Sequence, residues 1–164
     1  MWRASSTAVL GIYLNDHLAG ATMGVELFRR ASGSAQGSVK TQLQELTTQV
    51  ERDRDSLLTL MGTLGIPVRR YKVLGGWVLE KTGRFKPNGR VLGRSPLSDL
   101  IELEGLVLGV QGKAAGFRAL RRLADTDPRI EAPNIDRLIE RAEQQADTLE
   151  QLRISTAARV LTTG

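Results

Sequence analysis

Residues 38–67 read SVKTQLQELTTQVERDRDSLLTLMGTLGIP, and they carry the clearest signal of the fold class. Their apolar residues recur at three- and four-residue spacing, the period of one helical face. These residues are Leu43, Leu46, Val50, Leu57, Leu60, Met61 and Leu64. Gly65 and Pro67 end the pattern, because glycine favours a helix C-terminus and proline cannot continue a helix. The stretch predicts a helix over 38–64.

Three other segments repeat this periodicity, and they predict helices over 5–31, 95–124 and 134–161. The segment 95–124 has a clear start signal, with Ser95 as N-cap and Pro96 as first helical residue. Helices of such similar length, roughly 40 to 45 Å at 1.5 Å per residue, favour side-by-side packing. The short joints near 32–37 and 125–133 predict two antiparallel hairpins.

The connection over residues 66–94 is long enough to travel the full height of such a bundle. It predicts a crossover that lets the third long helix run parallel to the second. The expected fold is therefore all-α: a four-helix bundle in one domain, residues 1–164, with two antiparallel hairpins and a long crossover.

The composition of the chain limits the kinds of functional site that it can contain. The chain has 164 residues, 41% hydrophobic residues, a net charge of +5 and no cysteine. Without cysteine there are no disulfides, thiolate metal sites or thiol nucleophiles, which fits a cytoplasmic protein. The most apolar window, 100–110, contains Glu102 and Glu104, so we expect no transmembrane helix.

The two hairpins with a long crossover, together with Tyr13-Leu14-Asn15-Asp16 in the first expected helix, resemble the ferritin-like superfamily, and particularly a bacterial stress-associated branch. The resemblance spans nearly the whole chain. In metal-binding members, the first and third helices each supply a glutamate, and the second and fourth each supply a Glu-x-x-His pair.

This sequence departs from that ligand pattern. Its single histidine is His17, in the first expected helix, so no Glu-x-x-His pair exists. The nearest counterparts are Glu51 with Arg54 and Glu143 with Ala146, and a cationic arginine cannot bind a metal. We therefore expect no cofactor. The alternative is an atypical iron or manganese site with oxygen-rich ligands, drawn from His17, Glu26, Glu51, Glu104, Glu143 and Asp147.

Several polar residues stand on faces that are otherwise apolar: His17, Asp53, Arg54, Glu104, Gln111 and Gln145. One interpretation is a repurposed metal pocket, and the other is an interhelical salt-bridge layer that fixes register. A carboxylate at Glu104 needs a partner or solvent, and Arg54 is one available partner. An Arg54 guanidinium beside Glu104 would supply the positive charge that a metal ion supplies in metal-binding members of the superfamily.

A row of glycines lies on one face of the helix predicted over 95–124: Gly105, Gly109, Gly112 and Gly116. Each costs roughly 1 kcal/mol against alanine inside a helix, so close contact with another backbone is the simplest offset. Gly20 and Gly24 form a matching small patch on the first helix. The contact lies either within the bundle, which we favour, or between two copies in a homodimer.

The expected crossover is strongly basic, with eight Lys or Arg residues against Glu80 alone over 69–94, a net +7. The candidates for binding an anionic partner are Arg69, Arg70, Lys72, Trp77, Lys81, Arg84 and Lys86. Val73, Leu74, Trp77 and Val78 predict one apolar side of a short amphipathic helix. The partner is then nucleic acid or an acidic membrane surface; alternatively, the segment covers the open side of the bundle.

The sequence holds no catalytic triad or nucleophile motif. We therefore expect a non-catalytic bundle that acts by protein interaction or as a structural protein, with a stress-related role implied by the resemblance. The alternatives are a carboxylate metal-binding protein and a binder of anionic surfaces.

Overall fold

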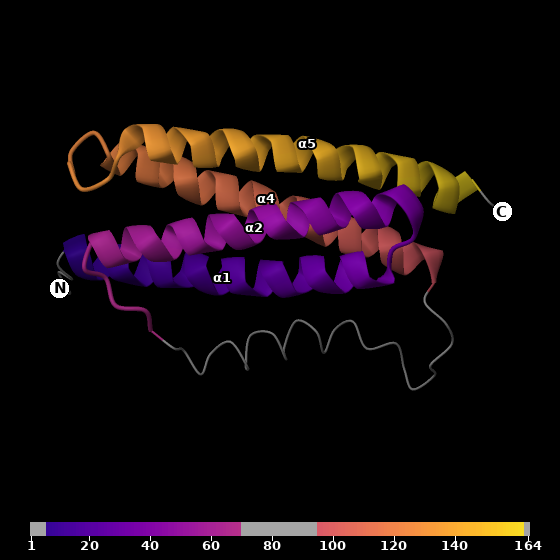
Figure 1. The fold of residues 1–164 in the computed structure, drawn as a ribbon, viewed down its shortest axis with the longest axis horizontal. Coiled ribbons are helices and arrows are strands. Elements are labelled where there is room, and N and C mark those ends of the chain that lie inside the picture. The colour runs from indigo at the N-terminus through magenta and orange to yellow at the C-terminus, as the bar shows by residue number, and fades with distance from the viewer. Residues whose placement is uncertain (1–5, 70–94, 163–164) are drawn as a thin grey trace, which may run out of the picture.

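The chain is all-helical in the part that the computed structural model describes, residues 6–69 and 95–162, where it contains four helices and no strand. The helices are α1 (Ser6–Ser34), α2 (Gly37–Thr63), α4 (Pro96–Leu123) and α5 (Ala132–Thr162), shown in Figure 1. This confirms the all-α class. The short helix expected within the crossover lies outside the described residues.

The four helices lie side by side along the long axis of the molecule (Figure 1). α1 contacts both α2 and α4, and α5 contacts both α4 and α2. α2 and α4 begin at the same end of the bundle, and α1 and α5 begin at the opposite end. α1 therefore runs antiparallel to α2, and α4 runs antiparallel to α5.

The ends of α2 and α4 follow the expected local signals. At the end of α2, the Ile66 N–H donates to the Met61 carbonyl at 2.9 Å and the Gly65 N–H to the Gly62 carbonyl at 3.0 Å, the two bonds of a Schellman motif. Gly65 has a φ of +68°, which glycine adopts without a steric penalty. At the start of α4, the Ser95 hydroxyl accepts a bond from the Leu97 N–H at 3.3 Å.

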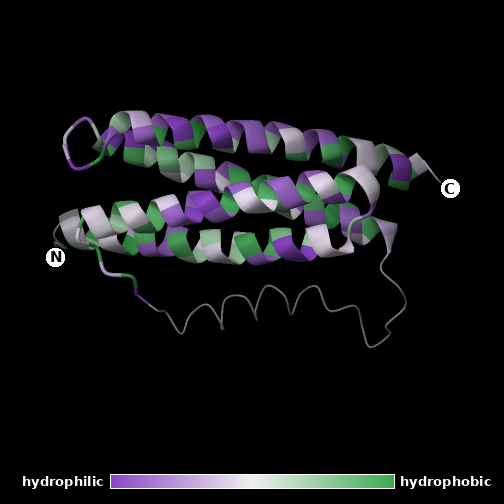
Figure 2. Cartoon of the chain, viewed as in Figure 1, coloured by the Kyte–Doolittle hydropathy of each residue, from purple (hydrophilic) through white to green (hydrophobic). Residues whose placement is uncertain are grey.

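Hydrophobic and hydrophilic residues alternate along every helix, as Figure 2 shows, and the apolar stripes meet inside the bundle. The buried core has two apolar clusters. One is built around Leu14, Leu57, Met61, Phe117 and Leu138, and the other around Val25, Phe28, Leu46, Leu106 and Leu149. Among the described residues, no helix is both long and apolar enough to cross a membrane.

Polar side chains lie between the two apolar clusters. We call this set the polar layer, and its members are Gln49, Asp53, Lys113, Arg141 and Gln145. Three helices contribute to it, namely α2, α4 and α5. The bundle thus has a hydrogen-bonded layer near the middle of its length, with apolar packing on either side.

Asn15 fixes the path of the chain just after α2. Its buried side chain accepts a hydrogen bond from the Arg69 N–H at 2.7 Å and donates to the carbonyls of Gly11 and Pro67 at 2.8 and 3.1 Å. An unpaired amide buried there would cost free energy, so these bonds account for its burial. Asn15 therefore ties residues 67–69 to α1.

Candidate functional site

The polar layer forms because its members stand on the buried stripes of their helices. Asp53 lies between Val50 and Leu57 on α2, and Gln145 lies one turn before Leu149 on α5. Helical packing buries the whole stripe, so Asp53 and Gln145 are each only 1% exposed. A buried carboxylate or amide needs partners, and the neighbouring helices supply them.

Asp53 is the centre of the hydrogen-bond network. Its Oδ2 accepts a bond from Lys113 Nζ at 2.6 Å and another from Gln145 Nε2 at 3.0 Å. Its Oδ1 accepts a bond from Arg141 Nε at 2.6 Å. Lys113 also donates to Gln145 Oε1, and Gln145 Nε2 lies 3.1 Å from Gln49 Oε1. Both oxygens of the carboxylate are thus bound to cations.

The Lys113 side chain is only 15% exposed, and a charged ammonium is unfavourable in such a largely buried position. Burial lowers the pKa of Lys113 below its ordinary value, the attraction of Asp53 acts against this, and repulsion from Arg141 adds to the lowering. Removing one partner from a buried ion pair costs about 3–5 kcal/mol, because the other charge is left unpaired. The members of the layer therefore depend on one another.

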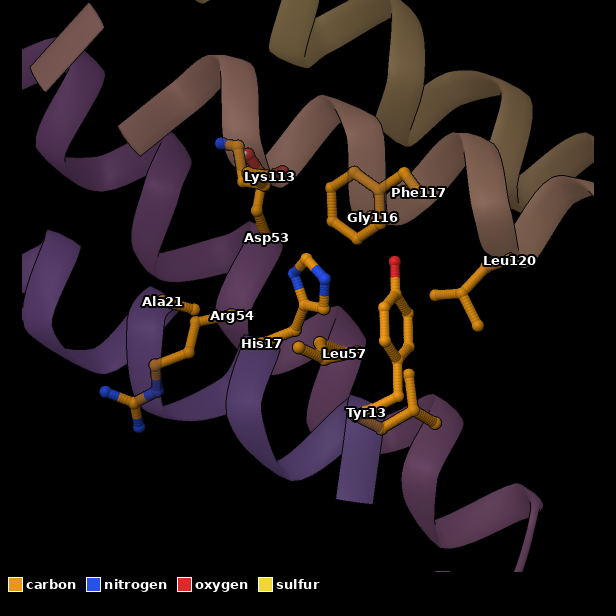
Figure 3. A pocket seen from close by; sticks show the side chains of 11 residues that line it. Tyr13, His17, Ala21, Asp53, Arg54, Leu57, Lys113, Gly116, Phe117 and Leu120 are labelled. Atoms are coloured by element: carbon orange, nitrogen blue, oxygen red, sulfur yellow. Dashed lines mark hydrogen bonds and ion pairs between the residues drawn. The ribbon is translucent and has the colours of Figure 1, made fainter. Parts of the chain in front are cut away.

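A cavity of about 20 Å³ lies beside the polar layer, lined by His17, Asp53, Arg54, Lys113 and Gly116 among others (Figure 3). This volume suffices for about one water molecule and excludes any larger ligand. The pocket therefore offers no room for an organic substrate or cofactor in this conformation.

His17 packs closely against its surroundings. Its ring centroid is 4.5 Å from that of Tyr13, and a Cβ placed on Gly116 would lie 2.6 Å from His17 Cε1. Burial lowers the pKa of His17 below its ordinary value, and the nearby charge of Asp16 acts in the opposite direction. Gly116 is thus the glycine whose missing side chain makes room for the imidazole.

The candidate metal ligands are not brought together. Glu26 and Glu51 both pair with Arg29, at 2.6 and 2.7 Å. Glu143 pairs with Arg118 at 2.7 Å, and Asp147 is exposed on α5. Within residues 6–69 and 95–162, no group of three or more histidine, aspartate or glutamate side chains is placed to hold a metal ion. His17, Glu26, Glu51, Glu104, Glu143 and Asp147 therefore do not fit a shared metal site.

The pair suggested between Arg54 and Glu104 does not form. Glu104 is half-exposed and lies 3.7 Å from Arg153, whereas Arg54 lies 3.7 Å from Asp55. The Arg54 guanidinium points away from Lys113 (Figure 3). The cation at the centre of the bundle is Lys113, because its position on α4 faces Asp53 while Glu104 lies on the outer side of that helix.

Sequence reasoning identified part of the polar layer. Asp53 and Gln145 were expected at polar positions on apolar faces, whereas Gln111 is exposed. Lys113 and Arg141 were missed, and so was Gln49. A usable signal was present for Lys113, which lies three residues after Val110 and four before Phe117 and therefore falls on the buried stripe of α4.

The glycine row has two different environments. A Cβ on Gly20, Gly24, Gly105, Gly109 or Gly112 would meet nothing within 4 Å, whereas one on Gly116 would meet His17. The described part of the chain therefore supplies no close contact at the first five glycines, and the contact that we favoured within the bundle stays a prediction for them. They face open space in the described part of the chain.

Arg69 is the member of the basic candidate set that the structure describes; it is exposed at the end of the bundle. The other candidates, Arg70, Lys72, Trp77, Lys81, Arg84 and Lys86, lie outside the described residues.

Comparisons of the chain with protein-family models, curated proteins and solved structures found no match. The functional argument therefore rests on the polar layer and the helix surfaces.

Proposed function

We propose that this chain is a non-catalytic helical bundle protein of ferritin-like topology, which acts through protein interaction and holds an ion pair where related bundles hold a metal. The observation that carries this proposal is the Lys113 ammonium, which donates to Asp53 and Gln145 at the centre of the bundle.

The helix directions support the ferritin-like topology. α2 and α4 begin at the same end of the bundle, so the end of α2 and the start of α4 lie at opposite ends (Figure 1). Two antiparallel helix pairs whose second and third long helices run parallel are the arrangement of ferritin-like bundles, which have one long crossover. In metal-binding bundles of that type, inward-facing side chains at the core hold the metal, and here that region contains the polar layer.

The charges of the polar layer support a metal-independent centre. A divalent cation there would compete with Lys113 and Arg141 for the Asp53 carboxylate, and it would leave at least one of these cations unpaired. That loss costs about 3–5 kcal/mol for a buried pair. The lysine already supplies positive charge, so the fold does not need a metal ion for neutralisation.

Elemental analysis and thermal melting of the untagged chain test this proposal. We expect no stoichiometric iron, manganese or zinc, and a melting temperature that neither a chelator nor added Mn²⁺ changes. The Asp147→Asn variant is the matched control: it removes an exposed carboxylate on α5 that was a candidate ligand, so its melt should equal that of the wild type. Stoichiometric metal with a melting temperature that falls on chelation would overturn the proposal.

A further inference from the structure

The outer side of α4 carries a narrow stripe of apolar and small residues, which we call the outer face of α4. It consists of Leu97, Ile101, Gly105, Leu108, Gly112, Ala115, Ala119 and Leu123, all of them exposed. The large members are 36 to 68% exposed, and Leu108 is the most exposed of them. At 100° per residue the stripe stays within an arc of about 80°. Its members thus form one continuous line.

The two glycines in this stripe are not explained by packing within the described chain. A Cβ on Gly105 or Gly112 would meet nothing within 4 Å. Each of them costs roughly 1 kcal/mol relative to alanine in a helix, and an exposed apolar stripe adds a further cost in water. A contact outside the described residues is the physical means of offsetting both costs.

The spacing along the stripe is symmetric. Its successive steps are four, four, three, four, three, four and four residues, as the helical period gives for one face, and they read the same in both directions around Val110. If two copies of α4 pack antiparallel about a two-fold axis at Val110, every stripe residue meets another stripe residue. At two levels a large side chain then meets a small one, namely Leu108 with Gly112 and Ile101 with Ala119. At the other two levels Leu97 meets Leu123 and Gly105 meets Ala115.

The charges of α4 favour the antiparallel direction, in addition to the pairs that Glu104 and Arg118 make within the chain with Arg153 and Glu143. Its acidic residues, Asp99, Glu102 and Glu104, all come before its outer basic residues, Arg118, Arg121 and Arg122. Antiparallel packing places the acidic half of one helix along the basic half of the other, whereas parallel packing places like charges together. Glu104 and Arg118 flank the stripe on the same edge, about half exposed, and the two-fold axis brings Glu104 of one copy close to the level of Arg118 of the other.

We infer that two copies of this chain form a symmetric dimer through the outer face of α4, with the two helices antiparallel and crossing near Val110. This inference concerns the outer surface and stands independently of the polar layer. It names a second copy of the chain as the occupant of the face, on the basis of the exposed apolar stripe and the complementary charges of the two halves of α4.

Molar mass measured by light scattering or sedimentation over a range of concentrations tests the dimer. We expect the full chain to have twice its monomer mass of 17.9 kDa, and Leu108→Glu to be a folded monomer. The matched control is Leu161→Glu, which changes a leucine that is 69% exposed on α5, away from the face, and should stay dimeric. A monomeric wild type at about 1 mM protein, where even a millimolar dissociation constant leaves much dimer, would overturn the inference. So would a dimer that survives Leu108→Glu.

A charge exchange tests the direction of packing. Glu104→Arg and Arg118→Glu should each raise the dissociation constant several-fold, because each brings like charges together across the interface. The double variant restores opposite charges and should return the dissociation constant toward the wild-type value. Circular dichroism melts of the three variants check that each remains folded. Failure of the double variant to recover, with all three folded, would overturn the antiparallel arrangement.

Discussion

Both carboxylate oxygens of Asp53 accept hydrogen bonds from cations, and the side chain has no exposed surface. The Asp53→Asn change leaves the Lys113 ammonium without a counter-charge in the interior, whereas Arg141 is 35% exposed and can turn its guanidinium to water. We expect the substitution to lower the free energy of unfolding by about 3–5 kcal/mol. Urea unfolding followed by circular dichroism measures this change.

Asp55→Asn is the control for that variant, because Asp55 is two residues away but 70% exposed. A surface substitution of this kind should change the free energy of unfolding by less than about 0.5 kcal/mol. Equal effects of the two substitutions would show that the polar layer is not a structural centre of the bundle.

His17 gives the fold a specific dependence on pH. Burial keeps its pKa in the folded state below the ordinary value of 6.5. The unfolded chain therefore binds a proton more readily than the folded chain in the interval between the two pKa values, and acidification through this interval favours unfolding. We expect the urea midpoint to fall between about pH 7.5 and about pH 5.5.

The chain has a single histidine, so the His17→Gln variant removes this contribution while the carboxylates titrate as before. We expect the fall in the urea midpoint between the two pH values to be smaller in the variant than in the wild type. An equal fall in both proteins would assign the acid sensitivity to carboxylates instead of to His17.

At the scale of the helix, Gly65 determines how α2 ends. Its φ of +68° is in the left-handed region, where a Cβ clashes with the backbone. Gly65→Ala should therefore lower the free energy of unfolding by about 1–2 kcal/mol. Gly62→Ala is the control: Gly62 is helical and its Cβ would meet nothing within 4 Å, so this change should stabilise the chain by about 0.5–1 kcal/mol. Thermal melts of the two variants should shift in opposite directions.

Helices were the most predictable elements because their signals are local. Gly65 with Pro67, and Ser95 with Pro96, mark a helix end and a helix start that the structure contains. α1 differs: it continues to Ser34, through part of the joint that was expected near 32–37. The Ser34 hydroxyl donates to the carbonyls of Arg30 and Ala31, and such bonds let serine remain within the last helical turn.

At the scale of the whole molecule, the polar layer was only partly predictable because it depends on which turns of different helices meet. Asp53 and Gln145 interrupt apolar stripes in the sequence, which marked them. Lys113 is flanked by Gly112 and Ala114, and lysine side chains are seldom buried unless they are paired. Its true environment is set by α2 and α5, 60 residues earlier and 32 residues later in the chain. The spacing along α4 places Lys113 on the buried stripe, but no local pattern tells which residues of α2 and α5 it meets there.

The layer also interrupts what would otherwise be one continuous apolar core, and this suggests that it fixes the register of the helices. The double variant Asp53→Leu, Lys113→Met joins the two apolar clusters and removes both halves of the ion pair. Arg141 is 35% exposed and can turn its guanidinium to water. The double variant should therefore unfold at a higher urea concentration than either single variant, since replacing a whole buried pair is often neutral or stabilising.

If the layer specifies register, the double variant should lose uniqueness of structure while it keeps stability. Without the buried ion pair, the apolar stripes of neighbouring helices can pack in more than one register. The amide NMR signals of the double variant should therefore broaden or multiply, and it should bind a hydrophobic dye more strongly than the wild type. An Ile139→Val change, made at a partly buried residue beside one apolar cluster, serves as the control and should leave the spectrum well dispersed. A double variant with a single sharp set of signals would show that apolar packing and the connections alone align the four helices, and that the ion pair has another role.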